Sequence, residues 1–301
     1  MSTLLDLHRK VFIGVVHLQP LPGSPRWRGD LESVIEFAVK DACAYERGGA
    51  DALFIENFGD VPFTRGSVAT ETIAAMAAAG RAIRQAVQLP IGFNVLRNDA
   101  RTALALCAVC GGTFIRVNVH TGAMLTDQGL IEGNAYETLR YRQRVCPEAQ
   151  IFADVHVKHA VPLGNWTIED AARDTVERGL VDALIVSGVG TGLAADIADV
   201  ERVRRTAPAT KVLLGSGVTL ANVRDFLPAA DGFIVGSSLK LRGKLSNPVD
   251  PKRVAALVRA IRKFNCSGSG AGVSPVKGVP PRSLQGGRDA PCDRRDACPT
   301  T

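Results

Sequence analysis

The sequence predicts a single (β/α)8 TIM barrel of the α/β class, followed by a disordered C-terminal tail. Short runs rich in Val, Ile and Phe alternate with longer amphipathic stretches up to about residue 264. Eight such units of about 33 residues each match the size of this barrel. The competing fold is a doubly wound open sheet, but residues 17–23, after the first strand, lack its G-x-G-x-x-G spacing.

The predicted strands are short apolar runs that end at Gly, Pro, Asn, Asp or His. In chain order they are Val11–Val16, Asp51–Glu56, Pro90–Val95, Thr113–Val119, Gln150–Val155, Asp182–Ser187, Lys211–Leu214 and Gly232–Val235. The predicted helices are the amphipathic stretches Leu31–Arg47, Ser67–Val87, Asp99–Cys110, Asn134–Cys146, Thr167–Arg178, Asp196–Thr206, Leu220–Leu227 and Pro251–Lys263. A segment that ends a helix and starts a strand, Gly48–Leu53, has a similar counterpart in Gly179–Leu184.

Composition divides the chain into a barrel domain, residues 1–265, and a tail, residues 266–301. The tail holds six Gly, five Pro and four Ser but few large apolar residues, so it cannot offset the entropy of ordering. The net charge is +6, and the tail contributes +2 of it. A barrel with so small a basic excess suits a small anionic substrate and no nucleic acid.

Cysteine usage and hydropathy bear on the compartment. Seven cysteines without regular spacing indicate a reducing environment. We expect neither a secretory leader nor a transmembrane segment, because every apolar run is short. The prediction is therefore a cytoplasmic protein, with an organelle matrix or peripheral association with a membrane as alternatives. We also expect a homo-oligomer.

Polar side chains gather where the predicted strands end, which is where barrels of this type carry their active sites. Those assigned to catalysis are His17, Glu56, Asp154, His156 and Lys158. Those assigned to substrate binding are Asn94, Arg116, Asn118 and His120. A period of two predicts one common face for residues 116, 118 and 120, and another for residues 154, 156 and 158.

A set of histidines and carboxylates can act in acid–base chemistry or hold a divalent metal. No spacing such as H-E-x-x-H fixes a metal site, so the metal ligands are unassigned and no other cofactor is indicated. Any single histidine has the alternative of being a hydrogen-bonded loop cap. For Lys158, a charge partner or anion contact is favoured over a Schiff base.

Glycine and serine dominate the ends of the last three predicted strands. The residues assigned to phosphate binding are Ser187, Gly188, Gly215, Ser216, Gly217, Gly236 and Ser237. Glycine lets backbone N–H groups approach a phosphate, and the loops after the seventh and eighth strands are its usual site. The alternative is ordinary tight turning. Lys240 either adds charge there or lies in solvent.

Two other features have structural interpretations. Cys107 and Cys110 have C-x-x-C spacing but lie at the end of a helix, which indicates packing thiols. Residues 120–133 form a long predicted loop after the fourth strand, and this loop is a candidate lid over the pocket.

Several segments at the strand ends carry a family resemblance. They are Ile13–Pro25, Gly48–Asp60 with Pro62-Phe63, Gly92–Asp99, Phe114–His120, Ala153–His159 and Gly215–Thr219. Together they cover nearly all of the predicted barrel and resemble the BtpA/SgcQ family. The resemblance implies a fold like the ribulose-phosphate-binding barrels and a family named for a factor in photosystem I biogenesis, with other members similar to sugar-metabolism proteins of undefined reaction.

Two functions of different classes follow. The first is an enzyme, an isomerase, lyase or hydrolase acting on a phosphorylated sugar or nucleoside-type small molecule. The second is a non-catalytic assembly or stability factor for a membrane complex. Ionisable groups that converge in a barrel mouth cost stability, and this favours the enzyme. A pentose-phosphate epimerase proper is disfavoured, because Gly215-Ser216 supplies no second acidic group.

Overall fold

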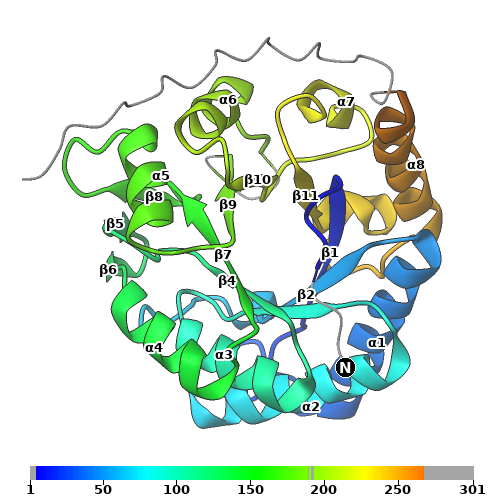
Figure 1. The fold of residues 1–301 in the computed structure, drawn as a ribbon. Coiled ribbons are helices and arrows are strands. Elements are labelled where there is room, and N and C mark those ends of the chain that lie inside the picture. The colour runs from blue at the N-terminus through cyan, green and yellow to red at the C-terminus, as the bar shows by residue number, and fades with distance from the viewer. Residues whose placement is uncertain (1–4, 189, 191–192, 268–301) are drawn as a thin grey trace, which may run out of the picture. The chain divides into compact units, whose positions relative to one another are not determined.

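The computed structural model describes residues 5–188, 190 and 193–267. Within them, eight parallel strands close into a barrel in the order β1-β11-β10-β9-β7-β4-β3-β2, with helices around it (Figure 1). The barrel strands are β1 Val11–His17, β2 Ala52–Glu56, β3 Ile91–Asn94, β4 Phe114–Val117, β7 Gln150–Val155, β9 Ala183–Val186, β10 Lys211–Leu214 and β11 Gly232–Val235. The predicted barrel is confirmed, and the open sheet is excluded because β1 pairs with both β2 and β11.

Each barrel strand is followed by a helix near its predicted position. The helices are α1 Leu31–Gly48, α2 Thr70–Ala86, α3 Ala100–Cys110, α4 Ala135–Val145, α5 Ile168–Glu177, α6 Ile197–Thr206, α7 Val223–Phe226 and α8 Pro251–Ser267. Helix α8 extends past its predicted end into the first residues assigned to the tail, and the rest of that predicted tail lies outside the described residues.

Local side-chain chemistry sets the helix ends. The Asp30 carboxylate caps α1 by accepting a hydrogen bond from the N–H of Ser33 at 3.0 Å, and Asp99 caps α3 in the same way. Gly49 and Gly111 end these two helices with φ of 88° and 71°, a left-handed conformation that favours glycine. The chain therefore turns into the next strand directly after each helix.

Aspartates at the amino-terminal ends of three barrel strands tie each strand to its neighbour. Their carboxylates accept backbone hydrogen bonds, Asp51 from Phe12 at 2.8 Å, Asp182 from Ile151 at 2.7 Å and Asp231 from Val212 at 3.0 Å. The first two lie in the two similar segments found in the sequence. These segments thus satisfy a strand N–H that the barrel edge would leave unpaired.

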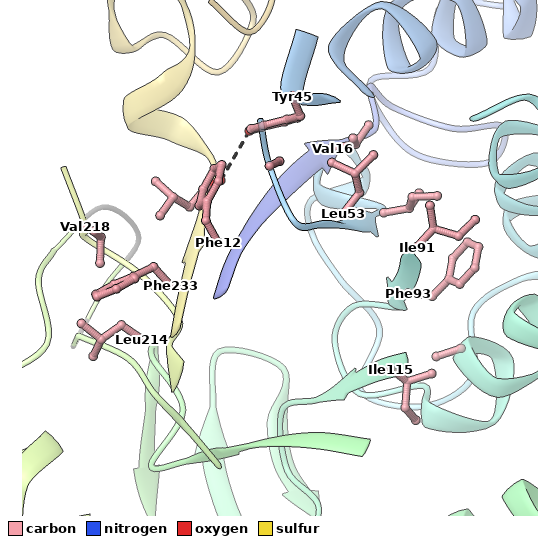
Figure 2. Packing of buried hydrophobic residues seen from close by; sticks show 14 of the residues in the cluster. Phe12, Val16, Tyr45, Leu53, Ile91, Phe93, Ile115, Leu214, Val218 and Phe233 are labelled. Carbon is pink, nitrogen blue, oxygen red and sulfur yellow. Dashed lines mark hydrogen bonds between the residues drawn. The ribbon is translucent and has the colours of Figure 1, made fainter. Parts of the chain in front are cut away.

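Two apolar layers hold the barrel. Alternate residues of β1, such as Ile13, face the barrel interior, where the rings of Phe54, Phe114 and Phe152 meet. The intervening residues face the helices, as Figure 2 shows for Phe12 and other outward-facing residues of the strands. The interior of the barrel is therefore filled with side chains, and a ligand can bind only at its ends.

An antiparallel sheet stands where the sequence predicts a loop. Strands β5 Ala123–Thr126 and β6 Gly129–Glu132 form a hairpin, and β8 Ala160–Pro162 pairs with β5. Met124 and Ile131 are paired on the buried face. Because these strands are so short, their alternation of apolar and polar residues was too brief to predict them.

Lys240 is neither a phosphate ligand nor a solvated side chain, in contrast to both predictions. It is fully buried, its Nζ contacts the Asp41 carboxylate of α1, and it lies 5.1 Å from the centre of the Phe37 ring. Asp41 also accepts a hydrogen bond from the N–H of Val249 at 2.7 Å. The pair thus fixes the chain after β11 against α1, since separating two buried opposite charges is costly.

Candidate functional site

Two adjoining cavities open at the end of the barrel where the strands have their carboxyl ends. This end of the barrel is called the mouth. The first, the Gly/Ser cavity, is lined by residues 215–219 after β10, residues 236–238 after β11 and His17 of β1. The second, the Phe cavity, encloses about 360 Å³ and is lined by Phe58, Phe63 and other residues that follow β2, β3 and β7. The two cavities share the lining residues Glu56, Phe58, Arg116 and Lys158, so they form one divided site.

A buried ion pair lies at the base of the mouth. The Arg116 guanidinium donates to both oxygens of Asp154, with Nε and one terminal nitrogen each at 2.8 Å. Ser187 donates to one Asp154 oxygen at 3.0 Å and Asn118 donates to the other at 3.1 Å. All four lone-pair directions of this carboxylate are therefore occupied, which suits a positioning group better than a proton acceptor.

Glu56 has a different environment. Its side chain is buried at the end of β2, and one oxygen accepts a hydrogen bond from the Asn94 amide at 2.6 Å. Because Glu56 lines both cavities, its second oxygen is the carboxylate acceptor that remains for a ligand. This geometry permits proton transfer at the boundary of the two cavities.

Two cations face the mouth without a carboxylate partner. Among the described residues, neither Lys158 nor Arg97 has an acidic oxygen within ion-pairing distance, and Arg97 donates instead to the carbonyl oxygen of Lys158. Burial and the neighbouring Arg116 lower the pKa of Lys158. A lysine held in this way can bind an anion, and it gives up a proton more readily than an exposed one.

His17 stands between the glycine loops and Glu56. Its ring meets the ring of Phe58 edge-on at 4.9 Å, and its Nδ1 is buried with no hydrogen-bond partner among the described residues. Burial lowers the pKa of His17 to about 4 despite the attraction of Glu56. His17 is therefore neutral at pH 7 and offers a hydrogen bond to a ligand without adding charge.

The structure does not bring His156 to the two cavities of the mouth. The backbone of His156 has φ of 52°, which ends the alternation of β7 and turns the ring toward a separate small cavity beside Trp166 of the chain before α5. Lys158 returns to the mouth two residues later. Of the three residues predicted to share one face, Asp154 and Lys158 therefore lie at the mouth and His156 does not.

His120 is also placed away from the cavities. It lies beyond the end of β4, is buried, and its Nε2 lies 2.9 Å from the carbonyl oxygen of Gly179. This contact connects the hairpin region to the end of α5. His120 thus has the alternative role that the sequence left open for any single histidine, a hydrogen-bonded structural group.

At the positions of the glycines predicted to bind phosphate, close packing leaves no room for a side chain. A Cβ at Gly188 or Gly217 would lie 2.3 Å or 2.2 Å from the carbonyl oxygen of Leu193. A Cβ at Gly215 would meet the Ser187 hydroxyl at 2.5 Å, and one at Gly236 would meet the His17 ring at 2.3 Å. Close packing alone accounts for glycine here, so the glycines by themselves do not indicate a phosphate site.

The serines of these loops differ in availability. The Ser216 hydroxyl accepts from the N–H of Gly188 at 3.0 Å and donates to Leu193 at 3.2 Å, so it joins two loops. Ser237 lines the Gly/Ser cavity. Sequence reasoning missed Phe58, Phe63 and Arg97 in the lining of the mouth, whereas Asp127 lies in the loop named as a candidate lid. The three missed residues lie inside the segments of the family resemblance, but in turns where periodicity gives no direction for a side chain.

Other predictions concern metal, thiols and membranes. No cluster of three or more His, Cys, Asp or Glu side chains suited to a metal occurs in the described part of the chain. Cys107 and Cys110 are buried free thiols, and burial raises the pKa of Cys110 to about 11. Within residues 5–188, 190 and 193–267, no helix is both long and apolar enough to cross a bilayer.

Comparisons with known proteins show which family this chain is similar to. A model of the BtpA family matches residues 8–263. An uncharacterized protein of Pyrococcus furiosus is 48% identical over 255 residues, 85% of this chain and 96% of that protein. Photosystem I biogenesis protein BtpA of Synechocystis sp. is 48% identical over 83% of this chain and 87% of its own length. Putative sgc region protein SgcQ of Escherichia coli is 35% identical, with coverages of 84% and 94%.

Solved structures resemble the fold alone. Phosphoribosyl anthranilate isomerase from Thermus thermophilus is 14% identical with a TM-score of 0.52, covering 84% of this chain and 99% of that one. Orotidine 5′-phosphate decarboxylase from Pyrococcus horikoshii is 14% identical with a TM-score of 0.53 and the same coverages. At this identity the likeness establishes a barrel architecture in common.

The depressed pKa of His17 predicts a pH dependence of stability. Between about pH 6.5 and pH 4 the unfolded chain binds a proton at His17 that the folded chain refuses, so the free energy of unfolding falls as the pH falls through this range. The loss attributable to His17 is roughly 2 to 3 kcal/mol. Urea denaturation at pH 7 and pH 4.5 measures it.

The variant His17→Gln should show a smaller loss between these two pH values than the parent. The matched control is His8→Gln, since His8 is exposed, and it should keep the parent's pH dependence. Equal pH dependence in His17→Gln and the parent would contradict the environment described for His17.

Proposed function

The chain belongs to the BtpA family, and we propose that it is an enzyme acting on a phosphorylated sugar or nucleoside-type small molecule. The observation that carries this proposal is the position of Lys158. It has no carboxylate partner among the described residues, and it faces both the glycine loops and Glu56 from the wall that the two cavities share. An anion site and a proton-transfer group thus lie next to each other.

The phosphate is proposed to bind in the Gly/Ser cavity. The loops after β10 and β11, the seventh and eighth strands of the barrel, bring Gly217 and Ser237 to one cavity. Phosphates in barrels of this type bind at these two loops. Lys158 supplies the positive charge, and His17, which is neutral at pH 7, supplies a hydrogen bond.

Glu56 is proposed as the general base. It is buried, one of its oxygens is held by Asn94, and it stands where the carbon skeleton of a phosphate-anchored substrate would begin. Lys158 would then stabilise the negative charge that develops on the substrate oxygen or return the proton. Asp154 is assigned a positioning role, because its hydrogen bonds hold Arg116 in the floor of the mouth.

The second candidate is a non-catalytic assembly or stability factor. It is favoured by one observation, that a relative at 48% identity is named a photosystem I biogenesis protein. A factor that only assembles a complex has no need for Glu56, Lys158 and Arg97 in a barrel mouth, where their desolvation costs stability. The enzyme is therefore the preferred proposal, and catalysis distinguishes the two.

Phosphorylated sugars are expected to stabilise the protein. A ligand at 100 times its Kd adds about 2.7 kcal/mol, which raises the melting temperature of a domain of this size by about 5 °C or more. In the variant Ser237→Glu a carboxylate faces the phosphate position, and the rise should vanish. A thermal-shift panel of sugar phosphates, with the dephosphorylated sugars beside them, measures this.

The control for this panel is Ser246→Glu, because Ser246 is exposed and lies outside the lining of the mouth. It should keep the full rise in melting temperature. If sugar phosphates stabilise Ser237→Glu as well as they stabilise the parent, the phosphate lies elsewhere and the assignment of the Gly/Ser cavity is wrong.

Catalysis should depend on Glu56. For the compound that stabilises the protein most, NMR in D2O follows turnover or exchange of carbon-bound protons into solvent. Glu56→Gln should reduce the rate by about 100-fold or more, since the amide cannot accept the proton. Glu148→Gln, at an exposed position, is the matched control and should keep the parent's rate.

A rate for Glu56→Gln within a few-fold of the parent would overturn the assignment of the base. If the parent binds the compound but shows neither turnover nor exchange, the enzyme proposal fails and the assembly factor is the better account.

A further inference from the structure

We propose that the Phe cavity binds the planar heterocyclic base of a nucleoside monophosphate, with the phosphate in the Gly/Ser cavity. The inference rests on the proposed function, and it selects the nucleoside-type ligand over a plain sugar phosphate. Three features of the Phe cavity carry it: its size and aromatic wall, the fixed orientation of Asn118, and the unpaired Nε of Arg97.

The Phe cavity is large enough for a small-molecule group in addition to the phosphate. Its volume of about 360 Å³ lies within the range of small-molecule sites, and the Gly/Ser cavity beside it is the proposed place for the phosphate. Phe58 and Phe63 stand 6.4 Å apart at an angle of 59°, and both are only partly buried. Together with Leu96 they form an apolar wall against which a flat ring can stack.

Asn118 lines this cavity and carries an unpaired acceptor. Its side chain is 2% exposed, and its amide nitrogen donates to Asp154 at 3.1 Å. Asp154 is an acceptor when ionised, so the nitrogen must face it and the carbonyl oxygen of Asn118 must face the other way. That Oδ1 is buried and has no partner among the described residues. An N–H on the edge of a ligand would satisfy it.

Arg97 presents the complementary donor. It is 3% exposed, lines the same cavity, and its Nε has no hydrogen-bond partner in the described part of the chain, although one terminal nitrogen binds the Lys158 carbonyl. Buried polar atoms left unpaired cost about 1 to 3 kcal/mol each. One acceptor and one donor left unpaired on two residues that line the same cavity fit a ring edge that carries both an N–H and a carbonyl oxygen, as uracil and hypoxanthine do.

The arrangement of the shared wall places the sugar. Glu56 and Lys158 line both cavities. A ribose that joins a base in the Phe cavity to a phosphate in the Gly/Ser cavity must pass these two residues. The proposed proton-transfer groups therefore face the sugar and its bond to the base, and neither the base nor the phosphate needs to react.

Isothermal titration calorimetry with three probes tests this proposal. They are ribose 5-phosphate, uridine 5′-monophosphate and cytidine 5′-monophosphate. Cytosine has the shape of uracil but an acceptor at ring position 3, where uracil has an N–H. We expect the uridine nucleotide to bind at least tenfold more tightly than either of the other two probes.

Two variants locate the effect. Phe63→Ala should reduce the affinity for the uridine nucleotide to about that of ribose 5-phosphate, while leaving the affinity for ribose 5-phosphate unchanged. Tyr136→Ala removes an aromatic side chain that is 62% exposed and lies outside the lining of the cavity, and it should change neither affinity.

The outcomes separate this inference from the proposed function. If all three probes bind equally, or if Phe63→Ala keeps the preference for the uridine nucleotide, the base site is wrong while the phosphate site stands. If the uridine and cytidine nucleotides bind equally and more tightly than ribose 5-phosphate, the reading of the ring edge by Asn118 is wrong. If no probe binds, the proposed phosphate site fails, and this inference fails with it.

Discussion

The ion pair between Arg116 and Asp154 determines what every other group in the mouth can do. Its two parallel hydrogen bonds join β4 to β7, and Ser187 after β9 extends the link to a third strand. Both partners are buried, so the pair is held by its geometry and by the cost of leaving either charge alone. It occupies the oxygens of Asp154 and neutralises Arg116. Glu56 and Lys158 remain as an acidic and a basic group that line both cavities and can act on a ligand.

The ion pair between Arg116 and Asp154 also lies at the boundary between the two cavities. Arg116 lies on the wall that both cavities share. Asn118 is oriented by the same carboxylate. One buried pair thus positions groups on both sides, as the proposed binding of one extended anionic molecule across the two cavities requires.

The architecture of the barrel could be predicted from the sequence because it depends on period. The eight strands and the helices after them follow from alternation of apolar runs and amphipathic stretches, and the closure of β1 on β11 agrees with their number. The site was harder to predict. Glu56 and Lys158 were found because they sit at strand ends, whereas His156 was misplaced because its left-handed backbone interrupts the period of two. Arg97 and Phe63 lie in turns, where only the folded chain shows the direction of a side chain.

The glycines at the ends of the last three strands were a weaker indication of a phosphate site than their positions suggested. Gly188 and Gly217 are required by the close approach of residues 193 and 194, and Gly236 by the His17 ring. The case for a phosphate rests on the convergence of two loops with a lysine that lacks a carboxylate partner among the described residues. This distinction identifies Lys158, and not the glycines, as the residue on which the functional account depends.

The most direct measurement of that account is a crystal structure of the protein soaked in ribose 5-phosphate. The account predicts a phosphate between the loops that contain Gly217 and Ser237, within hydrogen-bond or ion-pair distance of Lys158, with the sugar extending toward Glu56. A phosphate ordered at another part of the barrel, or a mouth that stays empty at saturating ligand, would contradict it.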